Sequence, residues 1–184
     1  MRVIAGSAKG RKLKTLDGDE VRPTTDKVKE AIFSSIQFDL PQAVVLDLFA
    51  GSGQMGIEAL SRGAEKVVFV DISSKSLSVT KENLSSLDML RCSELFQTNA
   101  IDFLVRNDGK YDIAILDPPY RKNLILQSLK KMGNHINYDG TVICEHESEL
   151  ELPDKVENFF VKKRYNYGKI SVTVYKKREE VDFI

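Results

Sequence analysis

The middle of the chain alternates between short apolar runs and stretches in which apolar residues recur at helical spacing. The apolar runs predict strands at residues 44–49, 66–72, 94–98, 111–116 and 141–145. The stretches that follow them predict helices that end near residue 60 and that cover residues 76–87, 101–106 and 124–135. Strands that alternate with helices form a parallel sheet with both faces covered. We therefore expect an α/β fold over residues 21–184.

The two ends of the chain follow other patterns. Residues 2–16 hold Gly6 and Gly10 between short β-like stretches and predict a small N-terminal β-hairpin, so residues 1–20 form a separate unit in this interpretation. A threonine cap followed by Asp26 marks a helix start, and Val28 and Ile32 lie on one stripe of that helix. Near the other end, residues 158–164 and 170–177 flank residues 165–168 and predict an antiparallel hairpin.

The formal net charge is zero, which by itself argues against non-specific binding of nucleic acid. The basic residues are nevertheless concentrated at the two ends of the chain. Residues 1–14 hold five basic residues and residues 162–178 hold seven, with no acidic residue in either segment. Both segments can bind phosphate, but they can equally be solvated edge strands.

Composition excludes several classes of protein. No apolar run approaches the roughly 20 residues that a membrane-spanning helix needs. The N-terminus is basic but lacks the apolar stretch of a signal peptide, so we expect a cytoplasmic protein. Cys92 and Cys144 are far apart and are expected to be buried free thiols. Their spacing from His135 and His146 matches no zinc pattern, so no metal site is expected.

A glycine-rich turn follows the first strand of the expected sheet. Open α/β sheets bind ligands at the carboxyl ends of their strands, and glycine lets the backbone approach a ligand closely. Asp47 precedes the glycines, and Asp71 ends the next strand, where acidic residues commonly bind ribose hydroxyls. The expected cofactor residues here are Asp47, Phe49, Ala50, Gly51, Ser52, Gly53, Asp71 and Ile72.

The same turn matches the pattern of a dinucleotide site, so a nicotinamide or flavin cofactor is a rival interpretation. Charge distinguishes the two. A carboxylate at Asp47 repels a pyrophosphate, whereas it attracts the α-ammonium and sulfonium groups of S-adenosylmethionine. We therefore favour S-adenosylmethionine, with a turn that binds no ligand as the remaining alternative for Asp47.

The third strand ends at Asn99 and Ala100, which are placed to meet the edge of an adenine ring through the Ala100 amide or the Asn99 side chain. Capping of the next helix by Asn99 or Asp102 explains the same residues equally well.

The most specific motif is Asp117-Pro118-Pro119-Tyr120, directly after the fourth strand. Two prolines stiffen the loop and remove two backbone donors, which leaves carbonyls free as acceptors. Asp117 and the Pro118 carbonyl can accept the two N–H bonds of an exocyclic amine, while Tyr120 offers a flat face to a base. Two in-plane acceptors let the nitrogen lone pair point toward a methyl donor and stabilise the charge that develops on nitrogen. The alternative is a proline turn that only ends the strand.

The sequence resembles the RsmD family of ribosomal RNA guanine-N2 methyltransferases over its whole length. Residues 46–53, Asp117 to Tyr120 and the terminal Tyr167-Gly168 are shared with many amino-methyltransferases. The basic N-terminal segment and the run that begins Arg22-Pro23-Thr24-Thr25-Asp26 are more particular to this family. Gln54-Met55 departs modestly from the family pattern, and we expect no functional effect.

The resemblance implies a class I S-adenosylmethionine-dependent methyltransferase fold: a Rossmann-like, mostly parallel sheet with a C-terminal antiparallel hairpin. It implies methylation of N2 of one guanine in small-subunit (16S) ribosomal RNA, within the assembled particle. We expect the protein to be a monomer. It places Arg22, Thr24, Thr25 and Asp26 over the cofactor, although capping of a helix also explains Thr24. The residues expected to bind RNA are Arg2, Lys9, Arg11 and Lys12.

Two other functions remain open. DNA adenine-N6 methyltransferases also carry Asp-Pro-Pro-Tyr, but they usually add a target-recognition domain for which this chain is short. A non-catalytic RNA-binding assembly factor would keep the fold, but the intact motif at Asp117 argues against a decayed site.

Overall fold

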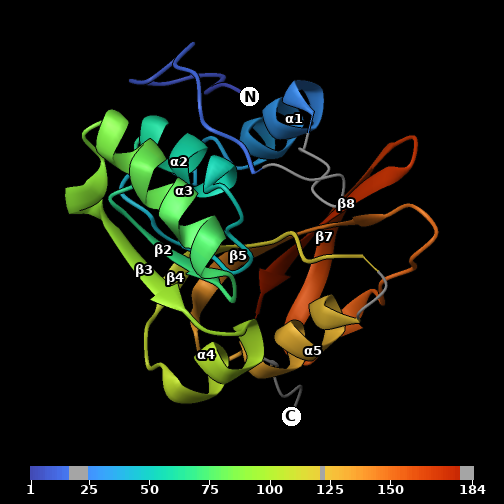
Figure 1. Ribbon diagram of the computed structural model, residues 1–184. Coiled ribbons are helices and arrows are strands. Elements are labelled where there is room, and N and C mark those ends of the chain that lie inside the picture. The colour runs from blue at the N-terminus through green and yellow to red at the C-terminus, as the bar shows by residue number, and fades with distance from the viewer. Residues whose placement is uncertain (17–24, 121–122, 179–184) are drawn as a thin grey trace.

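A computed structural model describes residues 1–16, 25–120 and 123–178 of the chain. One eight-stranded sheet in the order β3-β2-β1-β4-β5-β8-β7-β6 forms the centre of the molecule. Helices α1, α2 and α3 cover one face of this sheet, and α4 and α5 cover the other (Figure 1). The helices are α1 (Asp26–Ser35), α2 (Gln54–Ser61), α3 (Ser74–Ser86), α4 (Ala100–Arg106) and α5 (Leu124–Lys131). The strands are β1 (Val44–Asp47), β2 (Lys66–Asp71), β3 (Ser93–Gln97), β4 (Tyr111–Leu116), β5 (Ile136–Glu147), β6 (Lys155–Val156), β7 (Phe159–Tyr167) and β8 (Ile170–Lys177).

Strands β1 to β5 form the parallel part of the sheet that the sequence predicts. β1 pairs in parallel with both β2 and β4, β2 pairs with β3, and β4 pairs with β5. The carboxyl ends of all five strands therefore lie at one edge of the sheet. The loops that leave those ends hold the two motifs singled out above.

The C-terminal part of the sheet is antiparallel, which confirms the expected hairpin but moves its turn. β8 pairs with β5 and β7, and β7 runs on to Tyr167, so residues 165–167 belong to a strand and not to the turn. The turn consists of Gly168 and Lys169. Tyr165 and Tyr167 stack at 6.4 Å between ring centroids and pack partly against the core, which explains why the strand continues through them.

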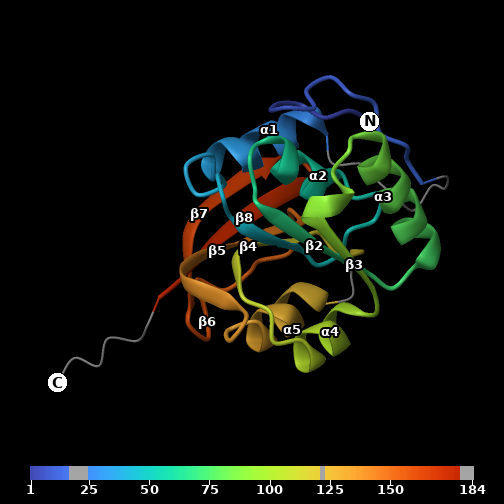
Figure 2. The ribbon, with the colours of Figure 1, turned by 90° about the vertical axis from the view of Figure 1, so that its left-hand side faces the viewer.

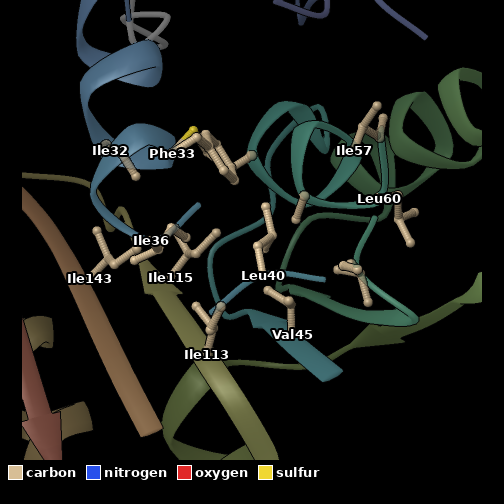
Figure 3. Close-up of a cluster of buried hydrophobic side chains, with 14 of the residues drawn as sticks. Ile32, Phe33, Ile36, Leu40, Val45, Ile57, Leu60, Ile113, Ile115 and Ile143 are labelled. Carbon is tan, nitrogen blue, oxygen red and sulfur yellow. The ribbon is translucent and has the colours of Figure 1, made fainter. Parts of the chain in front are cut away.

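Two apolar clusters hold the layers together. The first lies between the sheet and helices α1 to α3, and it includes Ile32, Phe33 and Ile57 with Ile115 of the sheet (Figure 3). The second lies on the other face, where Phe103 and Leu129 pack against strand residues such as Leu116. Burial on both faces explains why the central strands are almost continuously apolar.

The N-terminal segment is antiparallel but forms less of a hairpin than we expected. Its ends meet at one bridge, Arg2 to Lys12, with no regular strand. Side chains of α2 satisfy its backbone: the Glu58 carboxylate accepts from the amides of Ile4 and Ala5 at 2.8 and 3.0 Å. The segment lies against the helices of the first face (Figure 2) and adds Val3, Ala8 and Leu13 to the first cluster.

Other expectations are corrected in detail. α5 ends at Lys131 and not near residue 135, and a turn at residues 133–135 follows it. His135 is buried in that turn, and its ring contacts the carbonyls of Leu104 and Gly109. β5 is also longer than the apolar run at residues 141–145. Cys144 is buried, but Cys92 is exposed at the end of a short 3-10 helix, Leu90–Cys92, so only one of the two thiols is buried as predicted. None of the helices in the described ranges is both long and apolar enough to span a membrane.

Candidate active site

Two loops meet at the carboxyl edge of the sheet. The glycine-rich turn follows β1, and the Asp117 loop follows β4, the strand beside it. The register pairs Asp47 with Ile115, and the Leu48 amide donates to the Ile115 carbonyl at 3.1 Å. The topology thus brings together two motifs that are more than sixty residues apart in the sequence.

The glycine-rich turn uses backbone conformations that favour glycine. Gly51 and Gly53 have φ angles of 56° and 81°, in the left-handed region. A Cβ atom on Gly51 would meet no atom within 4 Å, so the backbone faces open space there. A Cβ atom on Gly53 would lie 2.7 Å from the Thr80 Cγ2 atom, against the protein interior. The turn therefore offers bare backbone to a ligand on one side and packs tightly on the other.

Asp47 lies beneath this turn and is 2% exposed. Its Oδ2 atom accepts a hydrogen bond from the Gly56 amide at 2.9 Å, which ties the end of β1 to the first turn of α2. Burial raises the pKa of Asp47 to about 7, the Gly56 hydrogen bond opposes this rise, and the nearby Asp71 adds to it. A cation bound at the turn would favour the ionised form of Asp47.

Asp71 ends β2 and also shapes the turn. Its two oxygens accept hydrogen bonds from the backbone amides of Gly51 and Ser73, each at 2.8 Å. The next residue, Ile72, is 71% exposed although it is large and apolar. An exposed apolar side chain beside an acidic one suits a nucleoside, whose flat base and ribose hydroxyls need these two kinds of contact.

Two further residues that shape the turn were not predicted from the sequence. Thr80 donates from Oγ1 to the Gly51 carbonyl at 2.9 Å, and Asn83 donates from Nδ2 to the Ser52 carbonyl at 3.0 Å. Both are buried polar residues of α3. The apolar stripe that contains Leu77 and Leu84 includes Thr80 at helical spacing, so a polar residue on this stripe was the available signal.

At the end of β3, the structure supports the capping alternative for Asn99. Its Oδ1 atom accepts from the Asp102 amide at 2.8 Å and caps α4. Ala100, the first residue of α4, is buried. A contact between Asn99 or Ala100 and adenine remains a prediction.

The residues expected over the cofactor lie partly outside the described residues, namely Arg22 and Thr24. Thr25 caps α1, with Oγ1 accepting from the Val28 amide at 3.4 Å. Asp26 pairs with Arg2, whose Nε atom lies 3.1 Å from Oδ2. A residue predicted to bind cofactor thus contacts one predicted to bind RNA. Phe49 is half-buried, and Ala50 and Ser52 are buried within the turn.

The Asp117 loop borders a pocket. Pro118, Pro119 and Tyr120 line it together with Leu126 at the start of α5 and with Glu145 and His146 of β5. Glu145 is 3% exposed, and no sequence argument had selected it. The ring of His146 is engaged within the sheet: Nε2 lies 2.9 Å from Thr173 Oγ1, and Nδ1 lies 2.8 Å from the Glu147 carbonyl. Prolines, an aromatic ring and a buried carboxylate thus line one small hollow beside the Asp117 loop.

The basic residues at the two ends of the chain differ in their surroundings. Lys9 and Lys12 are exposed, and Arg11 donates to the Ser86 carbonyl at the end of α3. In the C-terminal segment, Arg164 pairs with Asp154, and the buried Lys176 pairs with Asp39 and Asp139. Several C-terminal cations therefore stabilise the fold. At the N-terminus, Arg2 and Lys14 also form ion pairs, with Asp26 and Glu82, whereas Lys9 and Lys12 are exposed.

Known proteins resemble this chain along nearly its full length. The family model described as "Conserved hypothetical protein 95" matches residues 1–176. A putative rRNA methyltransferase, YlbH of Bacillus subtilis, is 39% identical to this chain. The alignment covers 97% of this chain and 100% of YlbH. The ribosomal RNA small subunit methyltransferase D of Haemophilus influenzae is 35% identical. The alignment covers 95% of this chain and 93% of that protein. A solved structure of a putative methyltransferase from Escherichia coli superposes with a TM-score of 0.88 at 28% identity, covering 97% of this chain and 98% of the other.

Proposed function

The chain belongs to the RsmD family, and from this premise we propose that it methylates the exocyclic N2 of a guanine in small-subunit ribosomal RNA, using S-adenosylmethionine. The observation that carries the proposal is the pairing of β1 with β4, which sets the glycine-rich turn beside the Asp117 loop at one edge of the sheet. The turn is the candidate cofactor site, and the Asp117 loop is the candidate site of the amine.

The residues at the turn fit S-adenosylmethionine. The open space at Gly51, the exposed Ile72 and the carboxylate of Asp71 suit the adenosine part. Asp47 places a buried carboxylate near the cationic end, and a carboxylate at this position disfavours the pyrophosphate of a dinucleotide. When bound, the cofactor supplies an electrophilic methyl group on a sulfonium.

The chain's own residues orient and activate the nucleophile. Asp117 and the Pro118 carbonyl accept the two N–H bonds of the amine, so the nitrogen lone pair is directed out of the base plane. Tyr120 stacks on the base, which must be turned out of any helix to enter the pocket. The amine nitrogen gains positive charge as it takes the methyl group. Asp117 stabilises the positive charge on nitrogen until the proton leaves.

The relatives named as ribosomal RNA methyltransferases support RNA over DNA as the substrate. We further propose that the assembled small subunit is the substrate, that the protein is a monomer in the cytoplasm, and that residues 1–20 are an RNA-binding unit on a methyltransferase domain of residues 21–184.

Transfer of labelled methyl groups to purified small ribosomal subunits tests the proposal. The expected product is N2-methylguanosine at one position, identified by nuclease digestion and mass spectrometry, with far less label on naked DNA. Label on adenine or on DNA would favour the adenine-N6 alternative. Binding of the particle without any transfer would favour a non-catalytic assembly factor.

A further inference from the structure

Glu145 is a buried carboxylate next to the candidate amine site. The register of the parallel strands pairs Leu116 of β4 with Cys144 of β5. Asp117 follows Leu116 and Glu145 follows Cys144, so these two residues lie at neighbouring positions of the sheet. Glu145 lines the same pocket as Pro118 and Tyr120 and is 3% exposed. The aromatic ring of Tyr120 and the carboxylate of Glu145 thus belong to one pocket, which the loop that begins at Asp117 borders.

Guanine carries a second hydrogen-bond donor beside the amine. Its N1–H group lies next to the N2 amine on the same edge, whereas N1 of adenine carries no hydrogen and is an acceptor. A carboxylate has acceptor capacity on both oxygens, so it can accept a substrate N–H group in addition to a bond within the protein. A buried hydrogen bond of this kind discriminates strongly, because a base without the donor would leave two acceptors facing each other.

We propose that Glu145 recognises the N1–H group of the target guanine and makes the pocket specific for guanine. This inference rests on the proposed function, since it assumes that N2 of a base is held by the Asp117 loop. His146 does not compete for this role, because both of its ring nitrogens are engaged with Thr173 and the Glu147 carbonyl. Glu147 lines the pocket at the end of β5 but is only half-buried, so water competes more for its oxygens.

The base 2,6-diaminopurine tests the inference because it keeps the 2-amino group but has no hydrogen on N1. Small subunits are reconstituted with RNA that carries either guanine or 2,6-diaminopurine at the position that the enzyme modifies. Wild-type enzyme should prefer guanine in kcat/KM by roughly 10- to 100-fold. In Glu145→Gln the amide can donate to N1 of the analogue, so the preference should shrink to about 3-fold or less, with weaker use of guanine.

The analogue also differs from guanine by its 6-amino group, but this group is the same for both enzymes. The change in preference between wild type and Glu145→Gln therefore measures the contribution of Glu145 alone. Glu149→Gln is the matched control: it removes an exposed carboxylate two residues beyond β5 and should keep the wild-type preference. Calorimetry should show unchanged affinity of Glu145→Gln for S-adenosylmethionine. If this variant does not fold, Glu145→Asp replaces it, and it should retain the preference for guanine with a lower kcat/KM.

Two results would overturn the role of Glu145 while leaving the proposed function intact: an unchanged preference in Glu145→Gln, or wild-type kcat/KM in Glu145→Asp. A collapse of the preference in Glu147→Gln but not in Glu145→Gln would assign the role to Glu147 instead. If wild-type enzyme methylates neither reconstituted particle, the proposed function itself is wrong.

Discussion

The carboxylate of Asp47 accepts a hydrogen bond from the backbone amide of Gly56, with 2.9 Å between Oδ2 and N. This contact joins the last residue of β1 to the helix that follows the glycine-rich turn, so the turn is held at both of its ends. It also keeps an acidic side chain buried, where its pKa rises to about 7. The ionisation of one residue is thus coupled both to the fold and to the candidate cofactor site.

The raised pKa predicts how cofactor binding depends on pH. Asp47 is protonated below pH 7 and ionised above it, and only the carboxylate attracts a cationic cofactor. Affinity for S-adenosylmethionine, measured by calorimetry between pH 5.5 and 8.5 (roughly one and a half units on either side of that pKa), should therefore increase as the pH rises through 7. Asp47→Asn should bind more weakly at pH 8 and lose most of this dependence. An identical pH profile in the variant would show that Asp47 does not contribute charge to the site.

The same group predicts a pH dependence of stability. Because the pKa in the folded state lies above the unfolded value, the folded protein holds a proton that the unfolded chain has lost. The free energy of unfolding should thus decrease from about pH 4 to pH 7 by up to about 1.4 kcal/mol per pH unit from this group. Urea denaturation should show this contribution disappear in Asp47→Asn. Glu149→Gln, which removes an exposed carboxylate, should retain it.

How much of this site is visible in the sequence depends on how local each interaction is. The glycine-rich turn and the Asp117 loop are short motifs after apolar runs, and the parallel order of the strands brings their carboxyl ends to one edge. The contacts of Glu58 with Ile4 and Ala5 span more than fifty residues and join a helix to an irregular segment. No periodicity encodes such a contact.

The position of Glu145 shows a second limit. In the sequence it ends an apolar run and looks like the solvent-exposed end of a strand. The antiparallel strand β8 pairs with it there, Glu145 with Val172, and the residue lines the pocket that the loop after β4 also borders. The strand order that creates this environment is a property of the whole sheet, so the residue becomes a candidate only in three dimensions.

Two glycines of the turn form a matched pair for a stability test. Gly51 and Gly53 both have positive φ, so alanine at either position should cost about 1–2 kcal/mol in backbone strain. At Gly53 the added Cβ atom also meets Thr80 Cγ2 at 2.7 Å, whereas at Gly51 it meets open space. Gly53→Ala should therefore lower the free energy of unfolding further than Gly51→Ala, by about 1–3 kcal/mol. Equal losses in urea denaturation would show that Thr80 moves aside without cost.

Asp117 should matter for chemistry and little for cofactor binding. Removing one preorganised acceptor should lower turnover in Asp117→Ala by about 10²–10³. Labelled-methyl transfer under single-turnover conditions measures this rate, and calorimetry should give nearly the wild-type affinity for S-adenosylmethionine. Wild-type turnover in the variant would rule out Asp117 as the amine acceptor.

The N-terminal basic residues and Tyr120 should contribute to RNA binding through different interactions. Measuring affinity at several salt concentrations distinguishes the two contributions. Phosphate contacts release counterions and therefore weaken as salt increases, whereas stacking of a base on an aromatic ring is largely insensitive to salt. Alanine at Lys9, Arg11 and Lys12 should weaken binding to small subunits and flatten its salt dependence, by about 0.7 in logarithmic slope per lost single-strand phosphate contact. Tyr120→Ala should leave the slope unchanged and lower the methylation rate.

A variant with the same change in charge provides the control for this experiment. Lys110, Lys130 and Lys131 are exposed, and Lys110 directly precedes β4, at the edge of the sheet opposite the candidate site. Alanine at these three positions should leave the salt slope near the wild-type value. Of the N-terminal cations, Arg11 already donates to the Ser86 carbonyl, so Lys9 and Lys12 should account for most of the change. If the N-terminal variant binds like wild type at every salt concentration, the exposed lysines at Lys162 and Lys163 become the better candidates for contact with phosphate.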